Sequence, residues 1–479
     1  MEIVAGLPLK YLRLESDIAP MNLVNICEYK PNTNYAAPSL DALRNCIAER
    51  LTSIRVLRQR IYESPFRMAS PLWLDDPHID IIYHVNEAFY TNDPNEVIAT
   101  LAPTKLDRGS PLWRVTIARS LENNSFTLIL VTHKALACRL QVSLFDLLFT
   151  EKTIISEDSE LYKTTINMEK SSVLGFQWRP DALPSRNELL NLAKSDWLSI
   201  PKQTKELSKL LLGQWAKKRI SENLVPKESL PPQWISAPKT IFNQPNGTKR
   251  SLAHIIITPK DARVLRRSFK SFVMRDLIFV LITRSLKDFL DSKLHHMKEE
   301  LIALVQCSAL DDKQLNYDAS SSVDDYQLLR LPTQTTDAIT QFETMLERRE
   351  MARDYYSTFT AQSNLGLIPS SVLTFLVKTY DKINAHKLHN PICNLVISES
   401  QKNQNMQHLN NFNLKHDLSF ASLLPNIGLH LCYWIDGDEA CISFTAAAPA
   451  LEANELKSYF LNSLDELKQS FTGSLRKAL

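Results

Sequence analysis

The chain has 479 residues, of which 44% are hydrophobic and 23% charged, and its net charge is +2. This composition excludes a disordered chain, and the near-neutral charge gives no argument for binding nucleic acid. Glycine, which lets a backbone approach a ligand closely, is scarce: there are 9, where average usage predicts roughly 34. The length exceeds that of a single-core domain, so we expect two domains.

The first residues, MEIVAGLPLKYLRLE, contain Glu2 and further polar side chains, so we expect no signal peptide. No apolar run approaches the ~20 residues that a membrane-spanning helix needs. Seven cysteines are scattered without CxxC spacing, which is typical of reduced core thiols and not of a disulfide framework or zinc site. We therefore expect a cytoplasmic protein whose contact with membranes, if any, is peripheral.

The first third of the chain predicts a helix followed by strands. Residues 39–61 are charged, with an apolar stripe at helical spacing. Residues 72–85 and 111–132 are predicted to supply strands, and Phe126 to Val131 has the apolar, β-branched character of a buried strand. The stretch Leu140 to Phe149 has the length and spacing of a helix.

The middle of the chain predicts a connection between two domains. Residues 151–184 are polar and without clear period, and Ser185 and Glu188 form a capping-box pattern for a helix ending near Leu198. The next predicted helix, over 202–220, is basic and amphipathic, which fits either a crossover helix packed between domains or a helix lying on an anionic membrane. A stretch over 222–233, rich in proline and charge, marks the boundary. The predicted division is 1–184, 185–235 and 236–479.

The C-terminal part alternates strands and helices and closes with an amphipathic helix beginning near Leu456. The polar stretch from Leu310 to Tyr326 is predicted to be a loop. The predicted strands and the long apolar helix follow in chain order: strand 251–257, helix 274–289, strand 301–307, and strands 394–398, 428–435 and 440–445. Strands and helices occur in both halves, so we expect an α/β protein built from a pair of two-layer domains.

The most informative segment is HKALACR, His133 to Arg139, which directly follows the predicted buried strand. A histidine at a strand end is a common position for a general base. The segment resembles the HHxxxDG motif of the wax-ester synthase/diacylglycerol acyltransferase family. The first histidine matches His133, but Lys134 stands at the second histidine, Cys138 at the aspartate and Arg139 at the glycine.

Further blocks of the chain resemble the same family, in the family's order. They are LRLESDIAPMNL at Leu12 to Leu23 with Asn22 at the usual histidine, SPLWLDDPHIDIIYHV at Ser70 to Val85, LDR and PLW at Leu106 to Trp113, APKTIFN at Ala237 to Asn243, and NLVIS at Asn394 to Ser398. The family's Asn-Asp pair at a helix start becomes Arg275-Asp276. The resemblance therefore covers nearly the whole chain, and most of the altered positions are those that line the family's reaction site.

The resemblance implies the two-domain chloramphenicol acetyltransferase-like fold of CoA-dependent acyltransferases, with a tunnel between the halves. Members of the family move a fatty acyl group from CoA to a long-chain alcohol or diacylglycerol. No resident cofactor is implied, because acyl-CoA is a substrate or ligand. The implied partners are acyl-CoA or neutral lipid and, at the periphery, a membrane or lipid-droplet surface.

Whether the motif can activate an alcohol depends on whether Lys134 can act as a base. The acceptor hydroxyl must lose its proton during attack on the thioester, and an unperturbed lysine, with a pKa near ~10.4, is protonated at pH 7. Lys134 would act as a base only if burial lowered that pKa by about 3 units. A structural or binding role is therefore favoured for Lys134. For His133 we favour a supporting role bonded to the backbone, and for Cys138 a buried thiol over a nucleophile paired with His133.

Two residues are candidates for ligand binding. Arg139 adds bulk and charge in place of a glycine, so it either holds a carboxylate or phosphate or plugs the channel, and we favour the plug. Asp276 keeps the acidic position of the second motif, although helix capping and the helix dipole also explain it. Trp73, Trp113 and His84 are expected to fill the core.

Two functional hypotheses follow. The first is a degenerate homologue that has lost most or all acyl transfer and serves as a lipid or acyl-CoA binder or as a partner subunit. The second is an active O-acyltransferase making triacylglycerol or wax esters with displaced catalytic residues, using Lys134, His133 or substrate positioning alone. Turnover that depends on Lys134 would separate the second hypothesis from the first.

Overall fold

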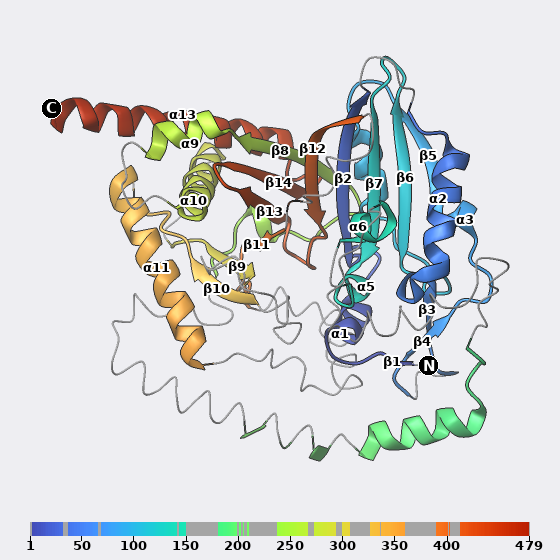
Figure 1. The fold of residues 1–479 in the computed structure, drawn as a ribbon. Helices are drawn as coiled ribbons and strands as arrows, with labels where there is room; N and C mark the ends of the chain where they lie inside the picture. The colour runs from blue at the N-terminus through green and yellow to red at the C-terminus, as the bar shows by residue number, and fades with distance from the viewer. Residues whose placement is uncertain are drawn as a thin grey trace.

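The structure, a computed structural model, shows two α/β halves that lie side by side (Figure 1). It describes residues 2–31, 37–65, 69–140, 143–149, 181–198, 201–202, 205, 208–209, 237–266, 273–293, 299–306, 326–335, 337–359, 389–400, 402 and 412–478. The helix predicted over 202–220, the boundary at 222–233 and the connection 151–180 therefore lie mostly or wholly outside the described residues.

The N-terminal half is built on a five-stranded sheet in the order β12-β2-β7-β6-β5. Its helices α2 and α6 pack on the sheet, and their buried leucines and isoleucines share one core with it. The strands of this sheet and the two helices have these bounds: β2 Asn22–Pro31, β5 Val85–Tyr90, β6 Trp113–Ser120, β7 Phe126–His133, β12 Phe412–Ala421, α2 Leu40–Ser53 and α6 Leu144–Phe149.

A second, three-stranded sheet in the order β1-β4-β3 lies below the first in Figure 1, near the N-terminus. Short helices connect it to the main sheet. These elements are β1 Glu2–Ile3, α1 Gly6–Leu14, η1 Arg55–Arg58, β3 Gln59–Tyr62, β4 Leu72–Asp75, α3 Ile81–His84, α4 Asn95–Leu101 and α5 Lys134–Ala137. Helix α1 packs against α5, which brings the start of the chain to the HKALACR segment.

The C-terminal half is a six-stranded mixed sheet in the order β10-β9-β11-β13-β14-β8. Helices α9, α10, α11 and α13 lie on the side away from the N-terminal half (Figure 1). The bounds are η3 Ile241–Asn243, β8 Arg250–Ile257, α9 Pro259–Arg266, α10 Met274–Ser292, β9 Ile302–Gln306, β10 Tyr326–Arg330, α11 Ala338–Phe359, β11 Leu395–Glu399, β13 Leu429–Asp436, β14 Glu439–Ala447 and α13 Ala453–Ala478.

One strand of the C-terminal half belongs to the sheet of the other half. Strand β12 pairs antiparallel with β2 along its whole length, from Phe412 opposite Pro31 to Ala421 opposite Leu23. Three buried residues of the C-terminal sheet, Leu252, Trp434 and Cys441, also belong to the N-terminal core. The two halves are therefore joined by backbone hydrogen bonds and by shared apolar packing.

Most strands and helices predicted in the described regions are confirmed, including strands β6 to β9, β11, β13 and β14 and helices α10 and α13. The capping box is confirmed, because the Ser185 hydroxyl accepts from the Glu188 backbone N–H and the Glu188 carboxylate accepts from the Ser185 N–H. The helix predicted over 39–61 ends early, at Ser53, because the chain continues as η1 and β3. The expectation of core thiols is wrong for Cys46, which is exposed on α2.

Candidate functional site

His133 ends strand β7 and caps the short helix α5. Its Nδ1 accepts a hydrogen bond from the Ala135 backbone N–H at 3.0 Å. A neutral ring with its lone pair at Nδ1 carries its proton on Nε2, and Nε2 lies 3.3 Å from Oε1 of Glu15. Since the one lone pair is already used, His133 has no atom left to take a proton from a substrate. The expected backbone-bonded, supporting role is what this geometry supports.

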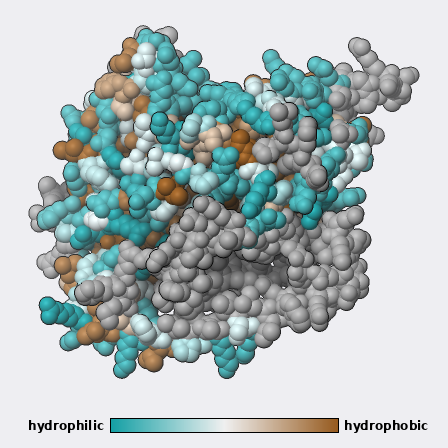
Figure 2. Space-filling model, turned by 180° about the vertical axis from the view of Figure 1, so that it is seen from behind, coloured by the Kyte–Doolittle hydropathy of each residue, from teal (hydrophilic) through white to brown (hydrophobic). Residues whose placement is uncertain are grey.

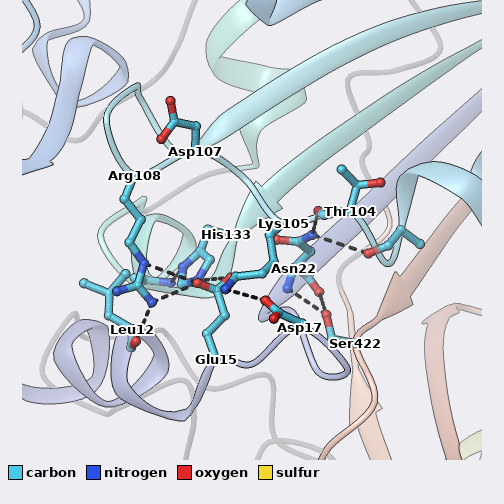
Figure 3. Close-up of polar contacts among 12 residues, drawn as sticks. Leu12, Glu15, Asp17, Asn22, Thr104, Lys105, Asp107, Arg108, His133 and Ser422 are labelled. Carbon is cyan, nitrogen blue, oxygen red and sulfur yellow. Dashed lines mark hydrogen bonds and ion pairs between the residues drawn. The ribbon is translucent and has the colours of Figure 1, made fainter. Parts of the chain in front are cut away.

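Glu15 lies at the centre of a buried charged network that joins three of the family-like blocks (Figure 3). Its carboxylate contacts Arg108 at 2.8 Å, and neither Glu15 nor His133 is more than 1% exposed. Burial alone would raise the pKa of Glu15, but the hydrogen bonds and charges of His133 and Arg108 outweigh it and lower that pKa to about 2. Arg108 also binds Glu63 and the carbonyl of Leu12.

Asn22 stands where the family has a histidine, and it lies opposite His133 in the β2–β7 pair. Its side chain donates to the carbonyls of Ala102 and Thr104. Its backbone N–H donates to the Ser422 hydroxyl at 2.7 Å, and that hydroxyl donates back to the Asn22 carbonyl (Figure 3). Asn22 is thus a structural link between the motif and the C-terminal half.

Lys134 begins α5 and is buried, with its backbone N–H bonded to the carbonyl of Met21 at 2.7 Å. Its Nζ lies 5.5 Å from the centre of the Tyr11 ring, which is within the range of a cation–π contact. The Lys134 charge also acts on the C-terminal sheet, because it is the second cause, after burial, that lowers the pKa of His430.

Sequence reasoning missed His430 and Ser398, which the C-terminal sheet brings to this region. Nε2 of His430 lies 2.9 Å from the Ser398 hydroxyl, and Nδ1 lies 2.9 Å from the Ser422 carbonyl. Burial, and after it the charge of Lys134, lowers the pKa of His430 to about 3. One signal in the sequence pointed to His430. In a strand, His430 and Cys432 project to one face of the sheet, and the alternate residues Leu431 and Tyr433 project to the other face, which is the core.

Cys138 and Arg139 follow α5, and the Arg139 side chain contacts the small N-terminal sheet. Cys138 is half-buried, and the ring nitrogens of His133 are engaged by Ala135 and Glu15, so the pairing of these two residues as nucleophile and base is not formed. Arg139 stacks 4.5 Å above the ring of Trp73, donates to Gln59 at 2.9 Å and forms an ion pair with Glu2. Whether Arg139 also meets a ligand or plugs a channel stays a prediction.

Asp276 is fully buried in the first turn of α10, where it forms an ion pair with Arg349 of α11 at 2.6 Å. It is not the capping residue, which is Val273. Its neighbour Arg275 bonds Glu399 at the end of β11, at 2.7 Å. The altered second motif thus forms two ion pairs within the C-terminal half, and the proposed ligand role of Asp276 stays a prediction.

The residues expected to fill the core do so. His84 stacks on Trp113 with 4.4 Å between ring centroids and contacts the Trp113 carbonyl through Nδ1 at 2.7 Å. The indole N–H of Trp113 donates to the Leu57 carbonyl at 2.8 Å. Trp73 is 1% exposed. Burial lowers the pKa of His84, which keeps this ring neutral.

A cavity of about 330 Å³ lies at the opposite end of β2 from the motif. It is lined by residues of both halves, including His254 and His416, whose ring centroids are 5.2 Å apart. None of the residues discussed at the motif lines it. Among the described residues there is no group of three or more histidine, cysteine or acidic side chains arranged to hold a metal ion. No helix in the described ranges has the length and apolar character needed to cross a membrane.

The whole chain superposes on solved acyltransferases. The wax ester synthase/diacylglycerol acyltransferase from Marinobacter aquaeolei VT8 matches with a TM-score of 0.61 and 16% identity, over 98% of this chain and 100% of that one. The TRI3 trichothecene 15-O-acetyltransferase from Fusarium sporotrichioides matches with a TM-score of 0.54 and 10% identity, over 98% and 94%. The chain therefore has the two-domain α/β fold of chloramphenicol acetyltransferase-like acyltransferases.

Sequence comparison matches the first third of the chain to one family. Residues 4–140 match the model of the wax ester synthase/diacylglycerol acyltransferase catalytic domain. "Probable diacyglycerol O-acyltransferase tgs3" of Mycobacterium tuberculosis is 29% identical over 171 residues, which are 35% of this chain and 58% of that relative. The chain thus spans less than two thirds of that relative. Residues 4–140 are thus similar to the catalytic domain of the wax ester synthase/diacylglycerol acyltransferase family.

Proposed function

We propose that this protein binds acyl-CoA or neutral lipid between its halves and has lost, or keeps only at a strongly reduced rate, the transfer of an acyl group to an alcohol or diacylglycerol. The observation that carries the proposal is the state of the two motif residues. Nδ1 of His133 is used by a backbone N–H, and Lys134 is a buried side chain over an aromatic ring. His133 has no free lone pair for alcohol activation, and Lys134 would supply one only if its pKa were lowered by about 3 units.

The retained features support a protein that still needs its acyltransferase architecture. The Glu15–Arg108–His133 network fixes the position of the end of β7. The hydrogen bonds between Asn22 and Ser422 join the two halves at this point. The Asn22–Ser422 bonds are the part of this arrangement that joins the two halves, so they support a retained ligand space between them.

Binding and turnover are measured on the same preparation. We expect saturable binding of palmitoyl-CoA by calorimetry, together with no ester from palmitoyl-CoA and hexadecanol or dioleoylglycerol above the rate without protein. Absence of binding contradicts the retained ligand role. Ester formation that Lys134→Ala abolishes contradicts the loss of transfer and establishes catalysis through Lys134.

The second candidate is an active O-acyltransferase with displaced chemistry. The observation that favours it is the neutral imidazole of His430, which the C-terminal sheet places within the field of Lys134. If His430 is the base, ester synthesis is retained in Lys134→Ala and lost in His430→Gln, whereas the first proposal predicts no ester from either variant.

We also propose a peripheral contact with a lipid surface, through the helix over 186–198. The coloured part of the surface in Figure 2 is largely hydrophilic, with isolated hydrophobic side chains. On this helix, however, Leu190, Trp197 and Leu198 are at least 59% exposed and recur at spacings of seven and eight, which places them on one side. Vesicle flotation tests the contact: Trp197→Ser is expected to weaken binding, and equal binding of both proteins contradicts it.

A further inference from the structure

The Ser398–His430 pair has a defined direction of hydrogen bonding. The Ser422 carbonyl can only accept, so Nδ1 of His430, 2.9 Å away, carries the ring proton. Nε2 therefore holds the lone pair, and the Ser398 hydroxyl, 2.9 Å away, donates to it. This is the arrangement of a hydroxyl nucleophile and its base, with the base oriented by a third group.

The pair is also placed where an acyl group would lie if it binds between the halves. Strands β11 and β13 are parallel neighbours, and Val396 is opposite His430. The alternate residues Leu431 and Tyr433 belong to the core of the C-terminal half, so His430 and Cys432 project to the other face of the sheet. On that face the positive charge of Lys134 acts on both His430 and Cys432, where it favours a lower pKa of each side chain.

We propose that Ser398 is a nucleophile activated by His430, and that it accepts an acyl group from a thioester or activated ester and passes it to water. This inference rests on the proposed binding of an acyl group between the halves, and it goes beyond that proposal because it assigns a slow hydrolytic activity. The substrate class is an acyl thioester.

Each step balances. The Ser398 oxygen bonds to the acyl carbon as the carbon–sulfur bond breaks, and the hydroxyl proton passes through His430 Nε2 to the leaving thiolate. Water then attacks the acyl-serine ester and gives a proton to His430. The Ser398 oxygen leaves with that proton, and the net products are a carboxylic acid and a thiol.

Ser398 is a better nucleophile here than its neighbour Cys432. Burial raises the pKa of the Cys432 thiol, so the reactive thiolate is rare. The lone pair of His430 is occupied by the Ser398 hydroxyl and not by the thiol. A thiol-directed reagent such as iodoacetamide is accordingly expected to leave the Ser398 reaction unchanged.

The test uses the full chain and a fluorophosphonate, with p-nitrophenyl acetate as a second reagent, read by intact mass and peptide mapping. We expect one stable phosphonyl adduct on Ser398, no adduct there in Ser398→Ala, and at least tenfold slower labelling in His430→Gln. Ser400→Ala is the matched control, since Ser400 follows the same strand and its hydroxyl contacts the Tyr433 carbonyl and the Cys432 thiol instead of the His430 ring. Its labelling is expected to equal that of the unmodified protein.

Labelling on another residue, or labelling of Ser398 that His430→Gln leaves unchanged, overturns the inference, and so does the absence of any adduct. Thermal unfolding of each variant shows whether it is folded. Because both reagents are small and contain no CoA, the two proposals fail separately. Intact labelling without palmitoyl-CoA binding contradicts the proposed function, whereas binding without labelling contradicts the role of Ser398.

Discussion

Glu15 and His133 face each other inside the N-terminal half, with 3.3 Å between Oε1 and Nε2 and neither side chain more than 1% exposed. The carboxylate fixes the ring so that its lone pair points at the Ala135 backbone N–H. The first histidine of the motif is therefore an orienting residue at the end of β7. Its preservation says nothing about whether the base at the next position is preserved.

Replacing Glu15 by glutamine is expected to destabilise the protein by about 3 kcal/mol, because it removes the buried carboxylate that pairs with Arg108 and leaves Arg108 with Glu63 as its one anionic partner among the described residues. Urea unfolding measures the change. The matched control is Asp17→Asn, which removes an exposed ion pair with Lys105 and should cost less than about 1 kcal/mol. Equal effects of the two substitutions would contradict the structural role of the network.

Acid should also remove the stabilisation that the Glu15 carboxylate provides, because it protonates this group. The pKa of Glu15 in the folded protein is about 2, below its ordinary value of 4.5, so the carboxylate stabilises the fold above pH 4.5 and this contribution disappears as the pH falls toward 2. The shift of about 2.5 units corresponds to about 3 kcal/mol. Unfolding free energies between pH 6 and pH 3 should show this slope in the unmodified protein, and a flatter slope in Glu15→Gln. Identical slopes would exclude Glu15 as the titrating group.

Asp276→Asn is expected to destabilise the protein by about 3 kcal/mol, since Arg349 then loses the buried carboxylate with which it forms an ion pair. Glu455→Gln, which breaks the half-exposed pair with Lys293, is the control and should cost less than about 1 kcal/mol. Palmitoyl-CoA binding by the folded Asp276→Asn protein should be unchanged. A loss of affinity without a loss of stability would instead give Asp276 the ligand role that the sequence suggested.

The pairing of β12 with β2 makes a prediction about the two halves expressed separately. Residues 1–184 alone leave β2 as an open edge that exposes Val24 and Ile26, so we expect oligomers or aggregates in size-exclusion chromatography. Co-expression with residues 236–479 should give a soluble complex. A monomeric, folded 1–184 fragment would show that β12 is dispensable for the N-terminal sheet.

Local patterns were enough for the elements that stabilise themselves or carry a clear period. Phe126 to Val131 was predicted as a buried strand from its composition, and Ser185 with Glu188 as a capping box from spacing alone. Strand β3 was missed, because the short run Gln59–Tyr62 is a strand only through its pairing with β4. Strand β12 was also missed, although its apolar residues alternate, because its partner lies in the other half of the chain.

The partners of the motif residues were not visible in the sequence. Glu15, Arg108 and His133 lie in three separate sequence blocks, and only the fold shows that they meet. His430 carried no motif at all. Its environment is created by Ser398, Ser422 and Lys134, which come from different strands and from the other half of the chain.

The loss of acyl transfer is tested most directly by the initial rate of ester synthesis from palmitoyl-CoA and hexadecanol at pH 7, compared between the unmodified protein and the triple variant Lys134→His, Cys138→Asp, Arg139→Gly. We expect no ester above the protein-free rate for the unmodified chain and measurable ester once an imidazole stands at position 134. Ester synthesis by the unmodified chain well above background would contradict the loss of transfer.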